Sequence, residues 1–165
     1  MIEIPNGISV DITDKVITVK GPKGTVSKPL PKKIKIEKNN NSIVLSSSKG
    51  DEALVGTYTS LLKSMFKGVT ENYARKFKAL YAHFPMSFEV KGRELLIKNF
   101  LGEKSPRKCK IVGDGTKVEA KGAMLTISGP DAEAVGQTVA NIKAALKIRE
   151  KDPRVFQDGV YEVFE

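Results

Sequence analysis

The sequence predicts an α+β protein built from two tandem, duplicated domains, each a mostly antiparallel β-sheet covered on one face by an α-helix. Short runs in which apolar and polar residues alternate are typical of half-buried strands, and each series of runs leads into a stretch of helical periodicity. The same order of runs occurs twice along the 165 residues. We place the first domain at residues 1–82 and the second at 83–165.

Four runs of the first domain have strand character, and they cover residues 8–12, 16–19, 33–36 and 42–45. Asp14–Lys15 is expected to form the turn of a hairpin between the first two runs. Asn39–Asn41 is expected to form another turn, because Asn tolerates positive φ.

A helix is expected to follow these strands. Its apolar positions recur at helical spacing, at Leu54, Tyr58, Leu61, Leu62 and Met65. Asp51 is placed to accept an N-terminal backbone amide, and Gly68 is placed to end the helix.

The second domain repeats this order. Strand-like runs at residues 86–90, 95–97, 109–111, 118 and 124–127 precede a helix that begins at Asp131 and is stopped by Asp152–Pro153. Gly24 and Gly102 lie 78 residues apart, and Leu54–Gly56 and Ala134–Gly136 lie 80 apart at the same point of each predicted helix. This near-constant offset favours duplication over two unrelated domains with a generic pattern.

The segment Tyr73–Tyr81 joins the two domains. Its aromatic and small residues alternate, which favours a strand, although Phe77, Leu80, Tyr81 and Phe84 also match a helical period. Little linker remains, so we expect a boundary near Ala82.

Charge favours a polyanionic partner. The formal net charge is +9, and residues 1–82 carry 14 basic against 7 acidic side chains, whereas residues 83–165 carry 14 against 12. A nucleic-acid-binding surface in the second half must therefore come from clustering of its basic residues.

Several classes of protein are disfavoured. The single cysteine, Cys109, excludes an intramolecular disulfide and a multi-cysteine metal site, and suits the cytoplasm. The start lacks a secretory pattern, and no apolar stretch approaches the roughly 18 residues of a membrane helix. His83 and Ser46–Ser48 have no identifiable catalytic partner, so we expect no enzyme, no cofactor and no metal, and we interpret His83 as a structural residue of the junction.

The first candidate binding segment is Lys20–Gly24. Its glycines let backbone amides approach phosphates, and Lys20 and Lys23 add charge. It matches the G-x-x-G of KH modules, but that motif joins two helices, whereas this one follows a strand. An ordinary Gly-Pro turn explains the segment equally well.

The second and third candidates lie in the C-terminal half. In the loop Asn99–Lys108, which follows Lys98, the cations can meet phosphates, while Phe100 is expected in the core. The tail at residues 147–159 mixes basic, amide and aromatic groups, and we expect it to be ordered because its apolar residues suit burial. In the loop, the cations expected to meet phosphates are Lys104, Arg107 and Lys108.

The chain resembles the family of large-subunit ribosomal protein L six, in its archaeal and eukaryotic form. The phrases that carry this resemblance are VITVKGPKG (16–24), KGVT (67–70), YAHFPM (81–86), NFLGEK (99–104), VGQTVANI (135–142) and DPRVFQDGVY (152–161). In the first helix the chain departs from the pattern, with Leu61–Leu62 and Ser64–Met65 where we expect the family to show His-Ile and Asn-Met.

The resemblance implies two similar sheet-plus-helix domains on the large ribosomal subunit, among neighbouring ribosomal proteins. It implies that the C-terminal domain makes most contacts to ribosomal RNA (rRNA), near the sarcin-ricin loop and the stalk base, where translational GTPases act. By position, it implies that the main contacts are Gly102, Lys104, Arg107 and Lys108 of the loop and Lys151, Arg154 and Gln157 of the tail. Lys98 stands beside the loop, and Lys20 and Lys23 rank below these residues. The alternatives are an RNA-binding regulator outside the ribosome, and a small enzyme that uses the Gly-Lys loop to hold a phosphate substrate.

Overall fold

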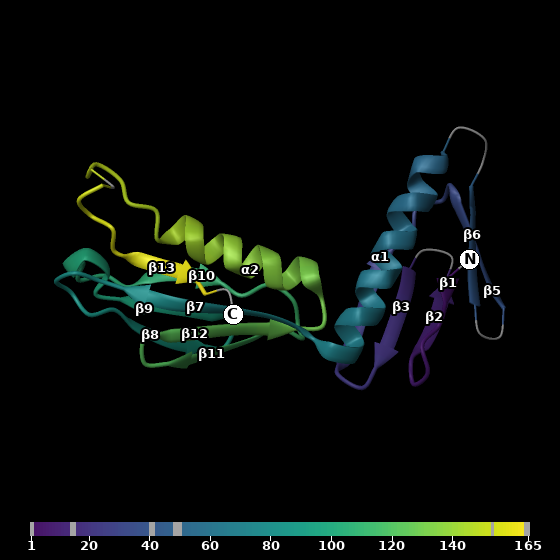
Figure 1. The fold of residues 1–165 in the computed structure, drawn as a ribbon, viewed down its shortest axis with the longest axis horizontal. Helices are drawn as coiled ribbons and strands as arrows, with labels where there is room; N and C mark the ends of the chain where they lie inside the picture. The colour runs from purple at the N-terminus through teal and green to yellow at the C-terminus, as the bar shows by residue number, and fades with distance from the viewer. Residues whose placement is uncertain (1, 14–15, 40–41, 48–50, 153, 164–165) are drawn as a thin grey trace. The chain divides into compact units, whose positions relative to one another are not determined.

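A computed structural model of the chain describes residues 2–13, 16–39, 42–47, 51–152 and 154–163. The chain divides into two compact units (Figure 1). Unit 1 comprises Met1–Asn72 with Pro130–Ala132, and unit 2 comprises Tyr73–Gly129 with Glu133–Glu165.

Unit 1 contains two antiparallel sheets and one long helix. The first sheet consists of β2 (Ser9–Thr13), β3 (Val16–Gly21) and β4 (Gly24–Pro29), in that order. The second has the order β1 (Ile2–Glu3), β6 (Ser42–Ser47), β5 (Ile34–Asn39). Helix α1 (Glu52–Glu71) packs its apolar face on these strands, and the core includes Val10, Ile17, Val19, Ile43, Leu62, Met65, Phe66 and Val69.

The four strands expected in the first half are present, and the structure adds β1 and β4. The sequence did not predict β4 because it buries a single side chain, that of Val26, which lies opposite Val19 of β3. The turn expected at Asp14–Lys15 lies outside the described residues, as do two of the three residues of the turn expected at Asn39–Asn41.

Both ends of α1 differ from the prediction. The Asp51 side chain makes no cap hydrogen bond, and instead accepts one from Lys33 Nζ at 3.2 Å. Gly68 does not end the helix, which continues to Glu71. Asn72 ends it with φ 59° and ψ 148°, outside the helical range, and its N–H donates to the Gly68 carbonyl at 3.0 Å.

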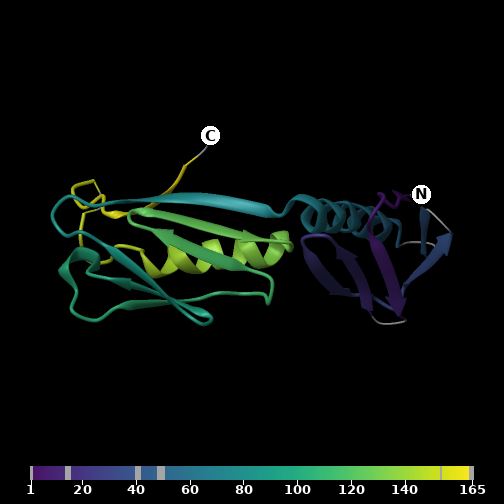
Figure 2. The same ribbon diagram turned by 90° about the horizontal axis from the view of Figure 1, so that it is seen from below.

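Unit 2 repeats the plan of unit 1 with an extra strand. One sheet has the order β10 (Arg107–Lys110), β9 (Glu94–Lys98), β8 (Ser87–Lys91), and the other has the order β11 (Lys117–Lys121), β12 (Met124–Gly129), β7 (Tyr73–Leu80), β13 (Gly159–Glu162). Helix α2 (Ala132–Ala145) covers one face of the second sheet (Figure 2). The core includes Phe77, Leu95, Ile97, Phe100, Leu125, Ile127 and Ile142.

The duplication is visible in the topology. In each unit a three-stranded meander is followed by two strands and a helix, and the second of these strands pairs with one that precedes the meander: β6 with β1, and β12 with β7. The prediction of a duplicated α+β fold is therefore confirmed. Helix α2 ends at Ala145, well before Asp152–Pro153, where the sequence had placed its stop.

The junction segment is strand β7, which confirms the strand interpretation over the helical one. Strand β7 pairs with β12 on one side and with β13 on the other, and its residues Phe77 and Ala79 are buried in the core of unit 2. The chain thus divides before β7, after Asn72, whereas the expected boundary near Ala82 lies after it.

Candidate nucleic-acid interface

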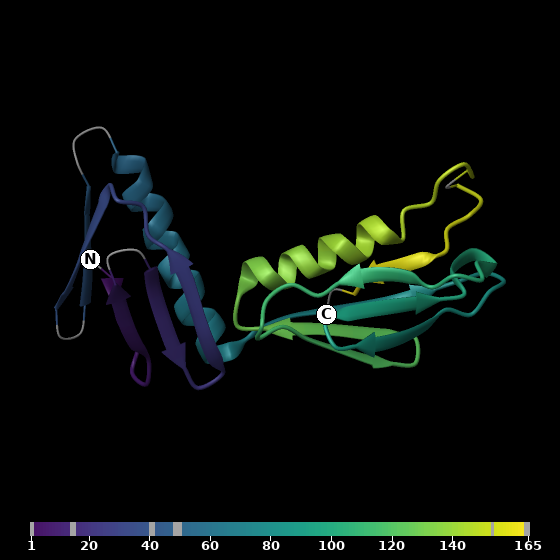
Figure 3. The ribbon, with the colours of Figure 1, turned by 180° about the vertical axis from the view of Figure 1, so that it is seen from behind.

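Two segments that the sequence singled out lie at the same end of unit 2, where α2 ends (Figure 3). One is the loop between β9 and β10, residues 98–108. The other is the tail between α2 and β13, of which the structure describes residues 146–152 and 154–158. We call these two segments together the basic end.

The loop is shaped by three left-handed residues around a buried aromatic ring. Asn99, Leu101 and Gly102 have φ values of 60°, 51° and 75°, and the Asn99 side chain donates to the Pro85 carbonyl at 3.0 Å. Phe100 is 1% exposed and belongs to the core, as expected from the sequence. The left-handed backbone conformation of Leu101 costs free energy. The burial of the Phe100 ring offsets this cost and so stabilises the turn.

Arg107 is tied to the protein by its guanidinium. Nε and Nη2 donate to the two carboxylate oxygens of Glu103 at 2.8 and 2.5 Å, and Nη1 donates to the carbonyl of Ala145, the last residue of α2, at 2.5 Å. The guanidinium carbon also lies 4.4 Å from the centre of the Phe100 ring. The hydrogen bonds from Arg107 hold the pKa of Glu103 below its usual range.

Arg107 therefore holds the loop against the C-terminus of α2, where orphan carbonyls favour a cation. The sequence predicted it as a phosphate ligand. In the structure its donors are engaged by Glu103 and Ala145 instead, because folding brings the end of α2 to the start of β10.

The remaining cations of the loop differ in whether they have an ionic partner within the protein. Lys98 Nζ forms an ion pair with Glu89 Oε2 at 2.6 Å, and its interaction with Lys98 is the main reason that the pKa of Glu89 is lowered. Lys104 and Lys108 are exposed, and neither has an ionic partner among the residues that the structure describes. These two lysines are the loop cations best placed to meet an external anion.

Local interactions order the tail. Lys151 Nζ lies 4.7 Å from the centre of the Phe156 ring, and Arg154 donates to Asp152 at 3.0 Å through Nη2. Gln157 Nε2 donates to the Arg154 carbonyl at 3.1 Å. The Arg154 side chain is nevertheless 89% exposed, so it can still reach a phosphate.

The tail is less buried than its composition suggested. Val155 is 73% exposed and Tyr161 is 47% exposed, although both were expected to be too apolar to remain in water. Val160, by contrast, is buried in the core. The sequence could not separate Val160 from Tyr161, because only the pairing of β13 with β7 shows which of these two neighbours faces the core.

The Gly-Lys segment of unit 1 is a tight hairpin turn between β3 and β4. Its Lys23 N–H donates to the Val69 carbonyl of α1 at 2.9 Å, and Lys20 Nζ pairs with Asp11 at 2.9 Å. A Cβ on Gly21 would lie 2.7 Å from Val69 Cγ2. Gly21 thus allows close packing on α1, and the Lys23 amide that could have held a phosphate is already bonded.

Groups suited to catalysis are not brought together in the described part of the chain. His83 is exposed, as are all of residues 81–85, which gives no support to its interpretation as a structural residue of the junction. Burial raises the pKa of the Cys109 thiol to about 11. Among the described residues there is no group of three His, Cys, Asp or Glu that could hold a metal ion, and no helix has both the length and the apolarity to cross a membrane.

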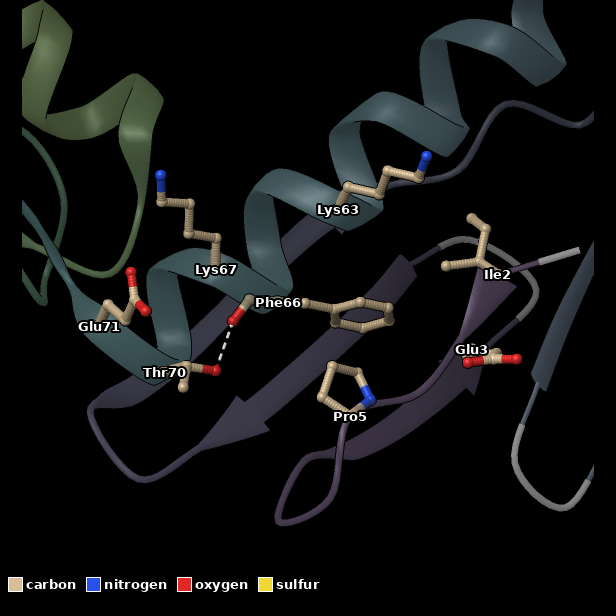
Figure 4. A pocket seen from close by; sticks show the side chains of 8 residues that line it. All are labelled: Ile2, Glu3, Pro5, Lys63, Phe66, Lys67, Thr70 and Glu71. Carbon is tan, nitrogen blue, oxygen red and sulfur yellow. Dashed lines mark hydrogen bonds between the residues drawn. The ribbon is translucent and has the colours of Figure 1, made fainter.

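One groove of unit 1 lies between its N-terminal strand and α1 (Figure 4). Phe66 and Ile2 form apolar walls, Lys67 stands beside Glu71 with Lys63 one turn earlier on α1, and the Thr70 hydroxyl donates back to the Phe66 carbonyl at 2.8 Å. This mixture of charges does not favour an anion, and the hydroxyl is held within the helix.

A duplicated α+β fold with exposed lysines gathered on loops at one end is typical of a polyanion-binding protein. The family model described as Ribosomal protein L6 matches residues 4–72 and 84–159. The protein "Large ribosomal subunit protein uL6" of Methanosarcina mazei is 49% identical over 98% of this chain and 94% of its own length. Its counterparts in Methanobrevibacter smithii and Staphylothermus marinus are 44% and 43% identical over 97% of this chain, and over 92% and 90% of their own lengths.

The chain belongs to the ribosomal protein L6 family. The resemblance stated from the sequence is therefore confirmed, and the family is a structural one and not a family of enzymes.

Sequence reasoning missed two groups at the basic end. Glu103 was not singled out, although its spacing of four residues from Arg107 was an available signal. The exposed aromatic residues beside the tail, Tyr81 and Tyr161, were interpreted only as structural.

Proposed function

We propose that this protein is a constituent of the large ribosomal subunit in the cytoplasm, where it binds rRNA and lies among other ribosomal proteins. The observation that carries the proposal is the family match, which spans both halves of the chain. Relatives that carry the name of a large-subunit protein are 43–49% identical over nearly their full lengths.

Recognition would be electrostatic and would use the basic end. Lys104 and Lys108 of the loop, together with Lys151 and Arg154 of the tail, are exposed cations on segments whose backbones are already fixed by internal bonds. Each phosphate neutralised releases condensed counterions, so such binding weakens steeply with salt. Gln157 and the Gly102 backbone would add contacts between these cations.

The other predicted residues would have smaller or indirect roles. Arg107 and Lys98 are paired with Glu103 and Glu89, so they would shape the surface more than they neutralise RNA. In unit 1, Lys23 is exposed and Lys20 is paired with Asp11, which supports a secondary contact at most.

The position that we propose is near the sarcin-ricin loop and the stalk base, next to the site where translational GTPases act. The resemblance of the C-terminal half supports this position, and so does the clustering of exposed cations at one end of unit 2. The protein would contribute a scaffold there and no chemistry of its own.

Gradient sedimentation of the full chain with large subunits, followed by binding to isolated large-subunit rRNA at rising salt, tests the proposal. We expect the chain in the large-subunit fractions, and an affinity that falls by orders of magnitude as salt rises from about 50 to 200 mM. Absence from those fractions despite RNA binding would support a regulator outside the ribosome. An affinity independent of salt would overturn the phosphate mechanism.

A further inference from the structure

We propose that a surface hollow beside β7 and β13 is a nucleobase site, which takes one unpaired RNA base stacked on Tyr161. This inference rests on the proposed function and adds a second kind of interaction to the phosphate contacts. The hollow lies in unit 2 and is lined by Leu80, Tyr81, Ala82, Val155, Gln157, Asp158 and Tyr161.

The ring of Tyr161 is held in place before any ligand arrives. Its hydroxyl donates to the Gln157 carbonyl at 2.8 Å, and a Cβ on Gly159 would lie 3.5–3.8 Å from three atoms at the hydroxyl end of the ring. The ring therefore lies back along its own strand over Gly159, where no side chain displaces it. Because it is still 47% exposed, it offers a fixed flat surface at little entropic cost to a ligand.

Apolar groups around the ring complete a site for a flat ligand. Leu80 and Tyr81 are each 46% exposed, and Val155 is 73% exposed. Leu80 lies opposite Gly159 in the β7–β13 pairing, which puts it on the same face of the sheet as Tyr161. A base that stacked here would cover apolar surface that is otherwise left in water.

The charges select a base and not a phosphate for the hollow itself. Its lining contains no lysine or arginine but does contain the carboxyl group of Asp158, whose Oδ1 accepts the Ala82 N–H at 3.4 Å. A phosphate would be repelled there, whereas a nucleobase carries no net charge and offers donors to Asp158 and Gln157.

Three cations neighbour the residues that line the hollow, in the strand pairing or along the chain. Lys78 of β7 is exposed and lies directly opposite Tyr161 in the strand pairing. Arg154 directly precedes Val155, and Lys151 lies over the Phe156 ring. This is the arrangement that a single splayed-out nucleotide requires, with its base inside and its phosphates outside, and single-stranded RNA is commonly bound in this way.

Two substitutions of Tyr161 test the proposal, with binding of the full chain to large-subunit rRNA as the measurement. Tyr161→Leu keeps an apolar side chain but removes the ring, so we expect binding about 5- to 150-fold weaker, with the salt dependence unchanged. Tyr161→Phe keeps the ring and should bind within about threefold of the original chain. Equal binding by the Leu variant, or equal losses in both variants, would overturn the proposal.

A fluorescence measurement covers the case in which Tyr161→Leu disturbs the fold. The chain contains no tryptophan, so Tyr81→Trp places a single reporter in the wall of the hollow. Its emission should be quenched when rRNA binds, whereas that of Val90→Trp, on exposed β8, should not be. A reporter that ignores rRNA but responds to a neighbouring ribosomal protein would assign the hollow to a protein partner. If the original chain did not bind rRNA at all, the proposed function itself would be refuted.

Discussion

Arg107 and Glu103 form a two-pronged ion pair that closes the loop of the basic end, with Nε to Oε2 at 2.8 Å and Nη2 to Oε1 at 2.5 Å. The third arm of the same guanidinium reaches the Ala145 carbonyl at the end of α2. One side chain thus connects the loop to the helix that leads into the tail. The lysines proposed to contact RNA stand on a surface that is assembled before RNA arrives.

Replacing Arg107 with Lys should destabilise the protein, because an ammonium group cannot reproduce the planar fork that serves Glu103 and Ala145 together. We expect the free energy of unfolding to fall by about 1.5–3 kcal/mol, the usual range for hydrogen bonds to a charged group. Chemical denaturation measures it. Lys108→Ala, at the exposed neighbouring position, is the matched control and should change stability by less than about 0.5 kcal/mol.

The ion pair also predicts a dependence of stability on pH. Hydrogen bonds from Arg107 lower the pKa of Glu103 in the folded state, so this contribution is complete above the unfolded-state pKa of about 4.3 and is lost as pH falls through the lower folded value. Glu103→Gln should reduce the loss of stability between about pH 5 and 3. Identical pH profiles of stability for the variant and the original chain would contradict this role for Glu103.

Removing both free lysines of the loop should weaken RNA binding without unfolding the protein. For Lys104→Ala with Lys108→Ala, we expect the slope of log affinity against log salt to decrease by roughly two, about one for each phosphate that is no longer neutralised. The control is Lys110→Ala with Lys117→Ala, which removes the same charge from exposed positions on β10 and β11. If both pairs of substitutions reduced the slope equally, net charge and not the basic end would govern binding.

Substitution of alanine for two glycines of unit 1 should change the stability of the protein in opposite directions. In Gly21→Ala the new Cβ would meet Val69 atoms at 2.7–3.0 Å, so we expect a loss of about 1–3 kcal/mol from overpacking. Gly56 lies within α1 and a Cβ there has open space, so Gly56→Ala should stabilise the protein by about 0.5–1 kcal/mol. Thermal unfolding of both variants checks the signs. Tolerance of Gly21→Ala would show that the turn does not pack on α1 as described.

Cys109 should be inert in the folded protein. Burial raises its pKa to about 11, so almost no reactive thiolate exists near neutral pH. We expect a thiol reagent at neutral pH to leave the native chain unmodified and to modify the denatured chain fully, as measured by mass spectrometry. A Ser105→Cys variant, exposed on the loop, provides a positive control for the reagent.

The sequence predicted the parts of the fold that follow from periodicity. Alternation identified strands such as β2 and β7, and the apolar stripe identified α1, because each pattern repeats over several residues. Strand β4 was missed because a single apolar side chain faces the core. The end of α1 was misplaced because the positive φ that ends the helix belongs to Asn72 and not to Gly68.

The RNA-binding site itself stays a prediction. Charge clustering singled out the loop and the tail, yet it could not distinguish Arg107 from Lys104, since both are cations in the same loop. Their difference depends on the Ala145 carbonyl, which comes from a distant part of the chain. The exposure of the Tyr161 ring could likewise not be predicted from the sequence, because only the strand pairing shows which face of β13 it occupies.

A density map of the assembled large subunit, from particles that contain this chain, tests the account most directly. We predict that Lys104, Lys108 and Arg154 lie within reach of rRNA phosphates, and that Arg107 still contacts Glu103 and Ala145. A map in which the basic end faces solvent, while RNA covers another surface of unit 2, would contradict the account.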